Sequence, residues 1–483
     1  MPKKSLKSKT IIGIFWNSVE RFLVQIVQFI LSIIMARLLL PSDYGLLGML
    51  AVFIAISTLF IDAGFTMALI QKKNRTEVDF STVFYFNIII SICCYFLFYT
   101  CAPLIATFYH TAELTSIIRI LFLNLIINSL CIIQNTKLSI AMNFKTKAIV
   151  NFVSVVVSGC FGVLIAYNGF GVWALVFQIL CQSIMNVILL YTFCRWKPLC
   201  VFSKESFKQL FHFGSKLLSA GFIATIMNNL YTIFIGKLFS PSQVGYYTRG
   251  MQFPALISST ISSILQGVTF PIMTSVQDDR EHLISIYRKM IRTTSFFVIP
   301  AMTGLAMISE PFIRYFLTEK WMPAVVIMQW ICLARLFTPL SALNMNILNA
   351  VGRSDLFLKV DLSKLPITMI ALIITVPLGL RPVVIGHCIT SFIAYFINAY
   401  LPGKFFGYGA FRQIKDMLPT LICTGGMMIV LLVIFFYIHS DLLKIVISII
   451  AGVLTYYILA FIFKIEELQD INIIIKKGWS KIS

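Results

Sequence analysis

The stretch ARLLLPSDYG at residues 36–45 is repeated 200 positions later, as GKLFSPSQVG at residues 236–245. In both copies an apolar segment closes with a basic residue, a Pro-Ser pair follows, and a second apolar segment begins at glycine. Proline cannot continue a helix and glycine tolerates a tight turn, so each copy predicts a helical hairpin. Two weaker similarities follow in the same order, at offsets of 209 and 210 residues. The chain is therefore predicted to contain two duplicated halves.

The composition indicates that most of the chain lies in a lipid bilayer. Hydrophobic residues make up 59% of the 483 residues and charged residues only 12%, and the mean hydropathy is +0.90. Soluble globular proteins usually have about 25% charged residues, so we expect a polytopic membrane protein. The apolar runs are continuous rather than alternating, which predicts an all-α protein and not a barrel.

Hydrophobic runs long enough to cross a bilayer predict about fourteen transmembrane helices. Six spans separate each hairpin from its copy, so both halves enter the membrane the same way round as parallel repeats. We expect an N-terminal six-helix lobe at residues 1–200, a second six-helix lobe at 201–410, and two additional helices with a cytoplasmic tail at 411–483. The spans are predicted near residues 11–36, 44–71, 79–102, 114–141, 148–167, 170–194, 207–236, 244–275, 292–311, 322–351, 360–378, 382–403, 417–438 and 442–463.

Basic residues set the predicted orientation. With the N-terminus in the cytoplasm, 27 Lys and Arg residues fall in inner segments and six in outer segments. This asymmetry follows the positive-inside rule and predicts that both termini are cytoplasmic. The net charge of +20 is then explained by topology and by attraction to anionic membrane lipids, without a nucleic-acid partner.

Several kinds of chemistry are not indicated. The eleven cysteines and five histidines show no metal-ligand spacing, so we expect no metal site. Gly169 to Ala174 formally match a dinucleotide fingerprint, but they lie between two spans and are interpreted as a tight turn. No predicted connection has room for a soluble catalytic or ATP-binding domain. We therefore expect no cofactor and no enzymatic activity.

Charged residues inside the predicted spans are the candidate functional groups, since charges at membrane depth face the protein interior or a water-filled cavity by default. Six of the eight are basic, which indicates an anionic passenger, plausibly one carrying phosphate. We expect a cationic cavity that binds the substrate through Arg21, Lys216, Arg249, Arg335 and Arg119, with Arg335 in the middle of its span. The remaining three are Glu20, Asp62 and Lys137.

Structural roles are open for the same residues. Glu20 and Asp62 are coupling or structural acids, and Asp62 lies at a depth where it can pair with Arg21. The side chains of Lys216 and Arg249 can also extend to a membrane interface, as can that of Lys137. The two hairpins, marked by Pro41, Gly45, Pro241 and Gly245, are expected to form a gate at the periplasmic mouth.

The chain resembles the polysaccharide-transporter (Wzx-type) family of the MOP flippase superfamily over nearly its whole length. Each motif alone is weak, but their combination is specific. The motifs are FWNS (15–18), RLLLPSDYG (37–45), DAGF (62–65), MNFK (142–145), GFGVWALV (169–176) and LNAVGRSD (348–355).

The resemblance implies two six-helix lobes in a V around a central cavity, in the bacterial inner membrane. It implies a flippase that moves undecaprenyl-pyrophosphate-linked oligosaccharide by alternating access, for O-antigen, lipopolysaccharide, capsule or exopolysaccharide biosynthesis. Its partners would be membrane lipids and the polymerase and glycosyltransferases of the pathway. The alternatives are another MOP transporter, either a lipid II flippase or a multidrug/cation antiporter, and a membrane glycosyltransferase or polymerase. The short outer loops disfavour the last class.

Overall fold

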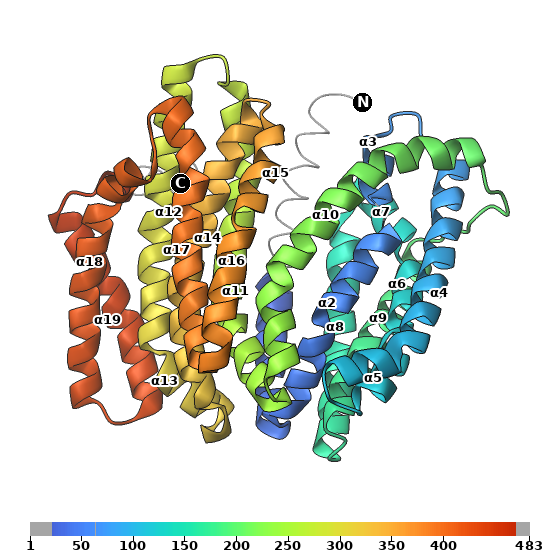
Figure 1. The fold of residues 1–483 in the computed structure, drawn as a ribbon, viewed down its shortest axis with the longest axis horizontal. Coiled ribbons are helices and arrows are strands. Elements are labelled where there is room, and N and C mark those ends of the chain that lie inside the picture. Colours follow the sequence, from blue (N-terminus) through green and yellow to red (C-terminus); the bar gives the residue numbers. More distant parts are fainter. Residues whose placement is uncertain (1–21, 63, 470–483) are drawn as a thin grey trace, which may run out of the picture. The chain divides into compact units, whose positions relative to one another are not determined.

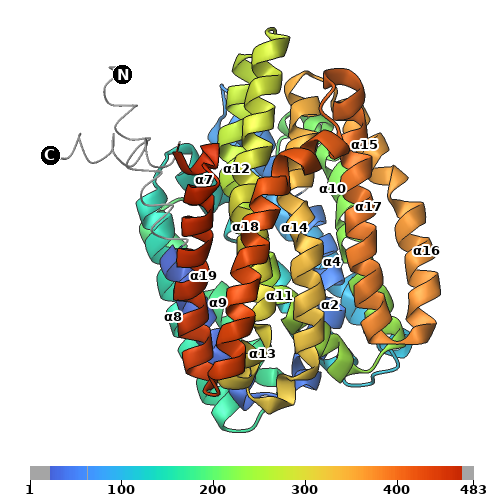
Figure 2. The same cartoon turned by 90° about the vertical axis from the view of Figure 1, so that its left-hand side faces the viewer.

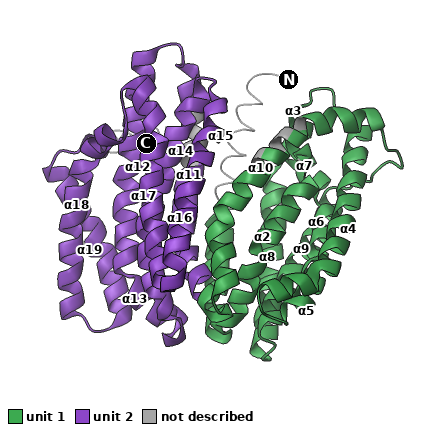
Figure 3. Cartoon of the chain, in the orientation of Figure 1, with its two compact units in different colours: residues 1–245 green, residues 246–483 purple. Residues whose placement is uncertain are grey.

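The computed structural model describes residues 22–62 and 64–469, and within these ranges the regular structure is helical throughout. Contacts divide the chain into two compact units, unit 1 at Met1–Gly245 and unit 2 at Tyr246–Ser483 (Figure 3). Unit 1 includes α10, the helix that leads into the second hairpin. The division into lobes at residues 200 and 410 remains a prediction.

Unit 1 begins, within the described part, with an apolar helix at Phe22–Leu38. The helices α8 (Phe144–Tyr167) and α9 (Val172–Phe193) run antiparallel and pack against each other, and α2 (Pro41–Asp62) packs against α10 (Lys204–Leu238) (Figure 1). The other described helices of this unit are α3 (Phe65–Gln71), α4 (Glu77–Phe108), α5 (Leu114–Leu121), α6 (Leu123–Ser129) and α7 (Ile132–Ile140).

The predicted hairpins are confirmed, and both begin their second helix in the same way. Pro41 is the first residue of α2, and Pro241 is the first residue of α11 (Pro241–Ser275). The Leu40 amide donates a 2.8 Å hydrogen bond to Oδ2 of Asp43, at the third helical position. At the equivalent place the Ser240 amide donates a 3.1 Å bond to Oε1 of Gln243. This backward bond satisfies a free amide at the helix start, where proline has none, so the repeat extends to the capping contacts.

The turn between α8 and α9 is also as predicted. Gly169 and Gly171 have φ angles of 81° and 54°, a region that glycine enters without steric cost. The helix α9 starts directly afterwards at Val172, so the two glycines reverse the chain between adjacent antiparallel helices.

Unit 2 contains most of α11 and the helices that follow it. Its C-terminal helices α18 and α19 pack side by side, as do α16 and α17 (Figures 1 and 2). The elements after α11 are α12 (Arg280–Met307), α13 (Ser309–Phe312), η1 (Ile313–Leu317), η2 (Glu319–Trp321), α14 (Pro323–Ala350), α15 (Ser354–Ser363), α16 (Leu365–Thr375), η3 (Val376–Leu378), α17 (Leu380–Phe406), α18 (Ala410–Tyr437) and α19 (Asp441–Ile462).

A fully buried polar network joins four helices of unit 2. Gln413 at the start of α18 donates to Tyr287 Oη on α12 at 2.9 Å and to Asn344 Oδ1 on α14 at 2.8 Å. Tyr395 on α17 donates to Gln413 Oε1 at 2.8 Å. Both ends of the Gln413 side-chain amide are therefore satisfied. Such a network rigidifies the helices that it joins, and it attaches the C-terminal pair to the rest of unit 2.

Membrane crossing is supported for ten helices. Within residues 22–62 and 64–469, ten helices or continuous helical stretches are long and apolar enough to span a bilayer. The predicted spans at 207–236, 244–275 and 360–378 coincide with α10, with α11 and with α15 together with α16, which are not among these ten. The protein is a multi-pass α-helical membrane protein, and the count of fourteen spans stays a prediction.

Candidate functional site

A polar cavity of about 370 Å³ lies inside unit 1, between α2, α3, α6, α7 and the start of α8. This volume is within the range of about 300–1,000 Å³ that is usual for ligand pockets. Nine of its twelve lining residues have polar side chains. The lining consists of Thr58, Ile61, Asp62, Thr66, Leu125, Asn128, Ser129, Ile132, Asn135, Thr136, Ser139 and Lys147.

Asp62, which the sequence marked as an acid at membrane depth, is part of this cavity. It is the last residue of α2, and its Oδ1 accepts hydrogen bonds from Thr66 Oγ1 at 2.5 Å and from the Thr66 amide at 3.3 Å. It forms no ion pair with any described residue. The predicted pairing with Arg21 cannot be examined, because Arg21 and Glu20 lie outside the described residues. The carboxylate of Asp62 lines the cavity.

Two amides face the same space from neighbouring helices. Asn128 lies on α6 and Asn135 lies on α7, and neither side chain forms a hydrogen bond with a described residue. The hydroxyls of the lining are arranged differently. Thr136 Oγ1 donates to the Ile132 carbonyl at 2.7 Å, a bond within its own helix that leaves the oxygen lone pairs free to accept. The cavity thus offers both donors and acceptors.

Arg335 lies on α14 in unit 2, with its side chain partly buried. Its Nε atom is buried and has no hydrogen-bond partner in the part of the chain that the structure describes. Its guanidinium lies close enough to Tyr247 and His387 to interact electrostatically with both. The Tyr247 hydroxyl is 3.4 Å from Nδ1 of His387. The planar guanidinium of Arg335 therefore has an unused N–H donor at Nε.

Arg249 lies on α11 and is only 4% exposed. Its guanidinium donates to the Gln252 side chain and lies 5.7 Å from the centre of the Trp321 ring. Trp321 is itself fully buried. These contacts place the Arg249 charge inside unit 2, against an aromatic face that stabilises a cation.

The other predicted cations do not join these two in the described structure. Arg119 on α5 belongs to unit 1, where its guanidinium lies 4.6 Å from the centre of the Tyr99 ring and its Nε has no hydrogen-bond partner. The side chain of Lys216 lies outside the described residues. Of the predicted site cations whose side chains are described, Arg335 and Arg249 lie in unit 2 and Arg119 lies in unit 1.

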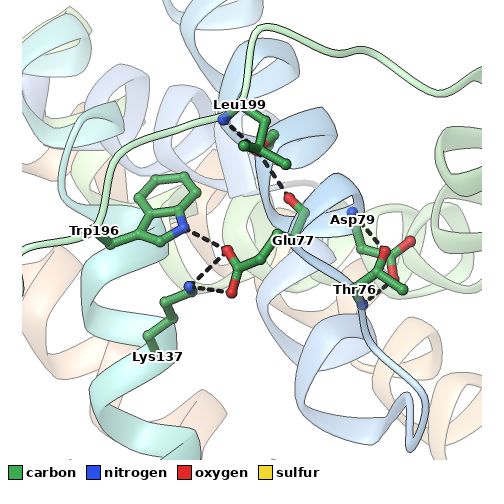
Figure 4. A network of polar contacts seen from close by, with 7 residues as sticks. Thr76, Glu77, Asp79, Lys137, Trp196 and Leu199 are labelled. Carbon is green, nitrogen blue, oxygen red and sulfur yellow. Dashed lines mark hydrogen bonds and ion pairs between the residues drawn. The ribbon is translucent and has the colours of Figure 1, made fainter.

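Lys137 has a structural role that its sequence context did not reveal (Figure 4). Its Nζ is 2.8 Å from both carboxylate oxygens of Glu77 at the start of α4. Trp196 Nε1 donates to the same carboxylate at 2.7 Å. Two backbone amides of the connection between α9 and α10 also donate hydrogen bonds to side chains on α4. The Leu199 amide donates to Ser81 Oγ at 2.9 Å, and the Ser203 amide donates to Thr82 Oγ1 at 3.1 Å. Together these bonds hold the 194–203 connection against the end of α4.

The cavity amides and His387 were missed by the sequence analysis, which considered only charged residues in spans and metal-like histidine spacing. A signal for the amides was present. Asn128 and Asn135 are seven residues apart, a spacing that places two side chains on one helical face. Asp62 and Thr66, four residues apart, form a similar pair.

A family model described as "Polysaccharide biosynthesis protein" matches residues 34–326. The chain belongs to this family. Among relatives, it is 25% identical over 429 residues to the teichuronic acid biosynthesis protein TuaB of Bacillus subtilis, covering 88% of this chain and 89% of TuaB. It is 23% identical over 445 residues to the lipopolysaccharide biosynthesis protein WzxC of Escherichia coli, with coverage of 88% and 89%. The resemblance to Wzx-type polysaccharide transporters is thereby confirmed.

Solved structures confirm the fold class of this polysaccharide biosynthesis family member. The lipid II flippase MurJ in an inward closed conformation aligns with a TM-score of 0.74 at 17% identity, covering 92% of this chain and 98% of MurJ. An inward-facing multidrug resistance MATE transporter of the MOP superfamily aligns with a TM-score of 0.61 at 15% identity, covering 83% and 98%. At these identities the similarity establishes the fold, which is that of MOP transporters.

Proposed function

We propose that the protein is a flippase that translocates an undecaprenyl-pyrophosphate-linked oligosaccharide across the bacterial inner membrane by alternating access. The product would enter O-antigen, capsule or exopolysaccharide assembly. The family membership and the MOP fold support the transporter class. The names of TuaB and WzxC, which refer to teichuronic acid and lipopolysaccharide biosynthesis, support a saccharide passenger.

The proposal is supported above all by the buried Nε donor of Arg335, which no described residue uses. A cation at membrane depth is costly, and leaving it without a paired anion costs more, so such residues are retained mainly for function. The buried Nε of Arg335 has no hydrogen-bond partner among the described residues. A diphosphate supplies several anionic oxygens that match the planar donors of guanidinium. Arg335 would therefore replace water around the pyrophosphate during crossing, with Arg249 as a second cation of the same unit.

The remaining parts of the proposal follow from topology. Both termini would be cytoplasmic, and the lipid-linked unit would be delivered on the inner leaflet by glycosyltransferases and removed on the outer leaflet by a polymerase. The reaction is transport without covalent change, so no catalytic residue is assigned. Energy would come from an ion gradient, from the membrane potential or from consumption of the product.

The test replaces Arg335 with Gln in a strain whose surface polysaccharide depends on this protein. We expect loss of surface polysaccharide and accumulation of lipid-linked intermediates on the inner leaflet, while membrane insertion is unchanged. Arg381→Gln is the matched control, because Arg381 is exposed at the start of α17 and is not part of the candidate site. Normal surface polysaccharide in the Arg335→Gln strain at ordinary expression would remove the basis of the proposed role.

A further inference from the structure

The cavity of unit 1 differs in chemistry from an apolar cavity of unit 2. A cavity of about 220 Å³ in unit 2, between α11, α12, α18 and α19, has Ser448 as its one polar lining residue among twelve. In the unit 1 cavity nine of the twelve lining residues are polar. Polar side chains at membrane depth are favourable where they can hydrogen-bond to water or to a polar ligand.

The groups that line this cavity match the hydroxyls of a sugar. Each sugar hydroxyl is both a donor and an acceptor, so it is best recognised by groups that together offer both. Asn128 and Asn135 each provide an NH₂ donor and a carbonyl acceptor that no described residue uses. Asp62 provides acceptors, and Lys147 provides donors from the start of α8.

The same lining fits a diphosphate poorly. Lys147 is its one cation, and the Asp62 carboxylate in the same cavity would repel phosphate oxygens. The volume also exceeds what one ion needs, because about 370 Å³ corresponds to about twelve waters at about 30 Å³ each. A neutral polyhydroxyl group of one or two sugar rings matches both the charge balance and the size.

We propose that this cavity binds the sugar portion of the passenger through Asn128, Asn135 and Asp62. The inference rests on the proposed flippase function and adds to it a separate recognition site for the saccharide, distinct from the cations of unit 2. The lining extends along the chain from Leu125 to Ser139, roughly four helical turns, and ends near Lys147 in a segment predicted to face the cytoplasm. A sugar loaded from that side would reach it before crossing.

The experiment uses the full-length protein in proteoliposomes and two probes. One probe is undecaprenyl pyrophosphate carrying the complete oligosaccharide unit, extracted from cells that make it, and the other is undecaprenyl pyrophosphate without a sugar. We expect Asn128→Ala and Asn135→Ala to reduce transfer of the complete unit about fivefold more than transfer of the sugar-free lipid, since each removes hydrogen bonds worth about that factor. Asn124→Ala is the matched control, because Asn124 is also on α6 but does not line the cavity.

The outcomes separate the two levels of the proposal. If the wild-type protein moves neither lipid, the flippase function fails and the sugar site fails with it. If it moves both, and the asparagine variants lower both equally or neither, the sugar site is wrong while the flippase function stands. An equal loss that added Na⁺ restores would assign the cavity to an ion instead and would also overturn the inference. Should Asn135→Ala not fold, Asn135→Gln, which displaces the amide by one methylene, carries the same expectation.

Discussion

Gly45 and Gly245 lie at equivalent positions of the two hairpins, and each is in direct contact with the other hairpin. A β-carbon added at Gly45 would overlap the carbonyl oxygen of Pro241 and would lie 3.0 Å from the Gly245 amide nitrogen. A β-carbon at Gly245 would overlap the carbonyl oxygen of Pro41. The contact is therefore reciprocal, as expected of two repeated elements that meet around a local two-fold axis. Each glycine is required because it alone leaves room for the opposing backbone.

This contact predicts the effect of two alanine substitutions. Gly45→Ala and Gly245→Ala should each destabilise the protein by about 1–3 kcal/mol, because backbone atoms must move to admit the methyl group. Gly425→Ala on α18 is the control, since nothing lies within 4 Å of its β-carbon position and alanine favours a helix. The measurement is the thermal unfolding midpoint in detergent. Equal midpoints for all three variants would show that the hairpin contact is loose.

The proposed gate predicts crosslinking at the same place. Cysteines introduced near Ser42 and Ser242, in a background without the eleven native cysteines, should form a disulfide when the hairpins are in contact. If the hairpins separate during the cycle, the yield should fall or rise with the supply of lipid-linked substrate. A yield that ignores substrate supply, together with transport that continues in the crosslinked protein, would argue against a gate.

The bonds between the 194–203 connection and α4 predict protease sensitivity. Ser81→Ala together with Thr82→Ala removes the acceptors for the backbone amides of Leu199 and Ser203. The connection should then be cut several-fold faster by a protease added to inverted membrane vesicles, because an unbonded loop opens more often. Thr192→Ala serves as control, since that exposed hydroxyl bonds only to carbonyls of its own helix. An unchanged cleavage rate would mean that other contacts hold the connection.

Replacement of Arg335 by Lys separates charge from shape. Lysine keeps the positive charge but loses the planar set of donors that can bind two phosphate oxygens together. We expect Arg335→Lys to retain partial transport, between the wild type and Arg335→Gln, when surface polysaccharide is quantified at matched expression. Full activity of the lysine variant would show that charge alone is sufficient and would exclude a bidentate contact.

Topology reporters test the basic-residue asymmetry directly. Fusions at Ser203, Gly352 and Ser483 should report the cytoplasm, and a fusion near Ser240 should report the periplasm, because fourteen spans place 27 basic residues inside and six outside. Any one of the first three found outside would contradict the parallel-repeat arrangement.

The elements that the sequence determined are those controlled by neighbouring residues. The hairpins at Pro41 and Pro241 could be predicted because proline, glycine and the end of an apolar run act within one or two helical turns. The all-α membrane class could be predicted because the thickness of the bilayer sets the length and hydrophobicity of each span. This requirement is the same whichever helices a span packs against.

The tertiary structure alone decided which polar groups meet. Lys137 contacts Glu77 from 60 positions away, and Trp196 reaches the same carboxylate from 119 positions away. Asn128 and Asn135 become a site only because Asp62, on another helix, faces the same cavity. Such contacts depend on how each helix is rotated about its axis. In a membrane that rotation is poorly marked in the sequence, because the lipid-facing and the protein-facing sides of a helix are both apolar.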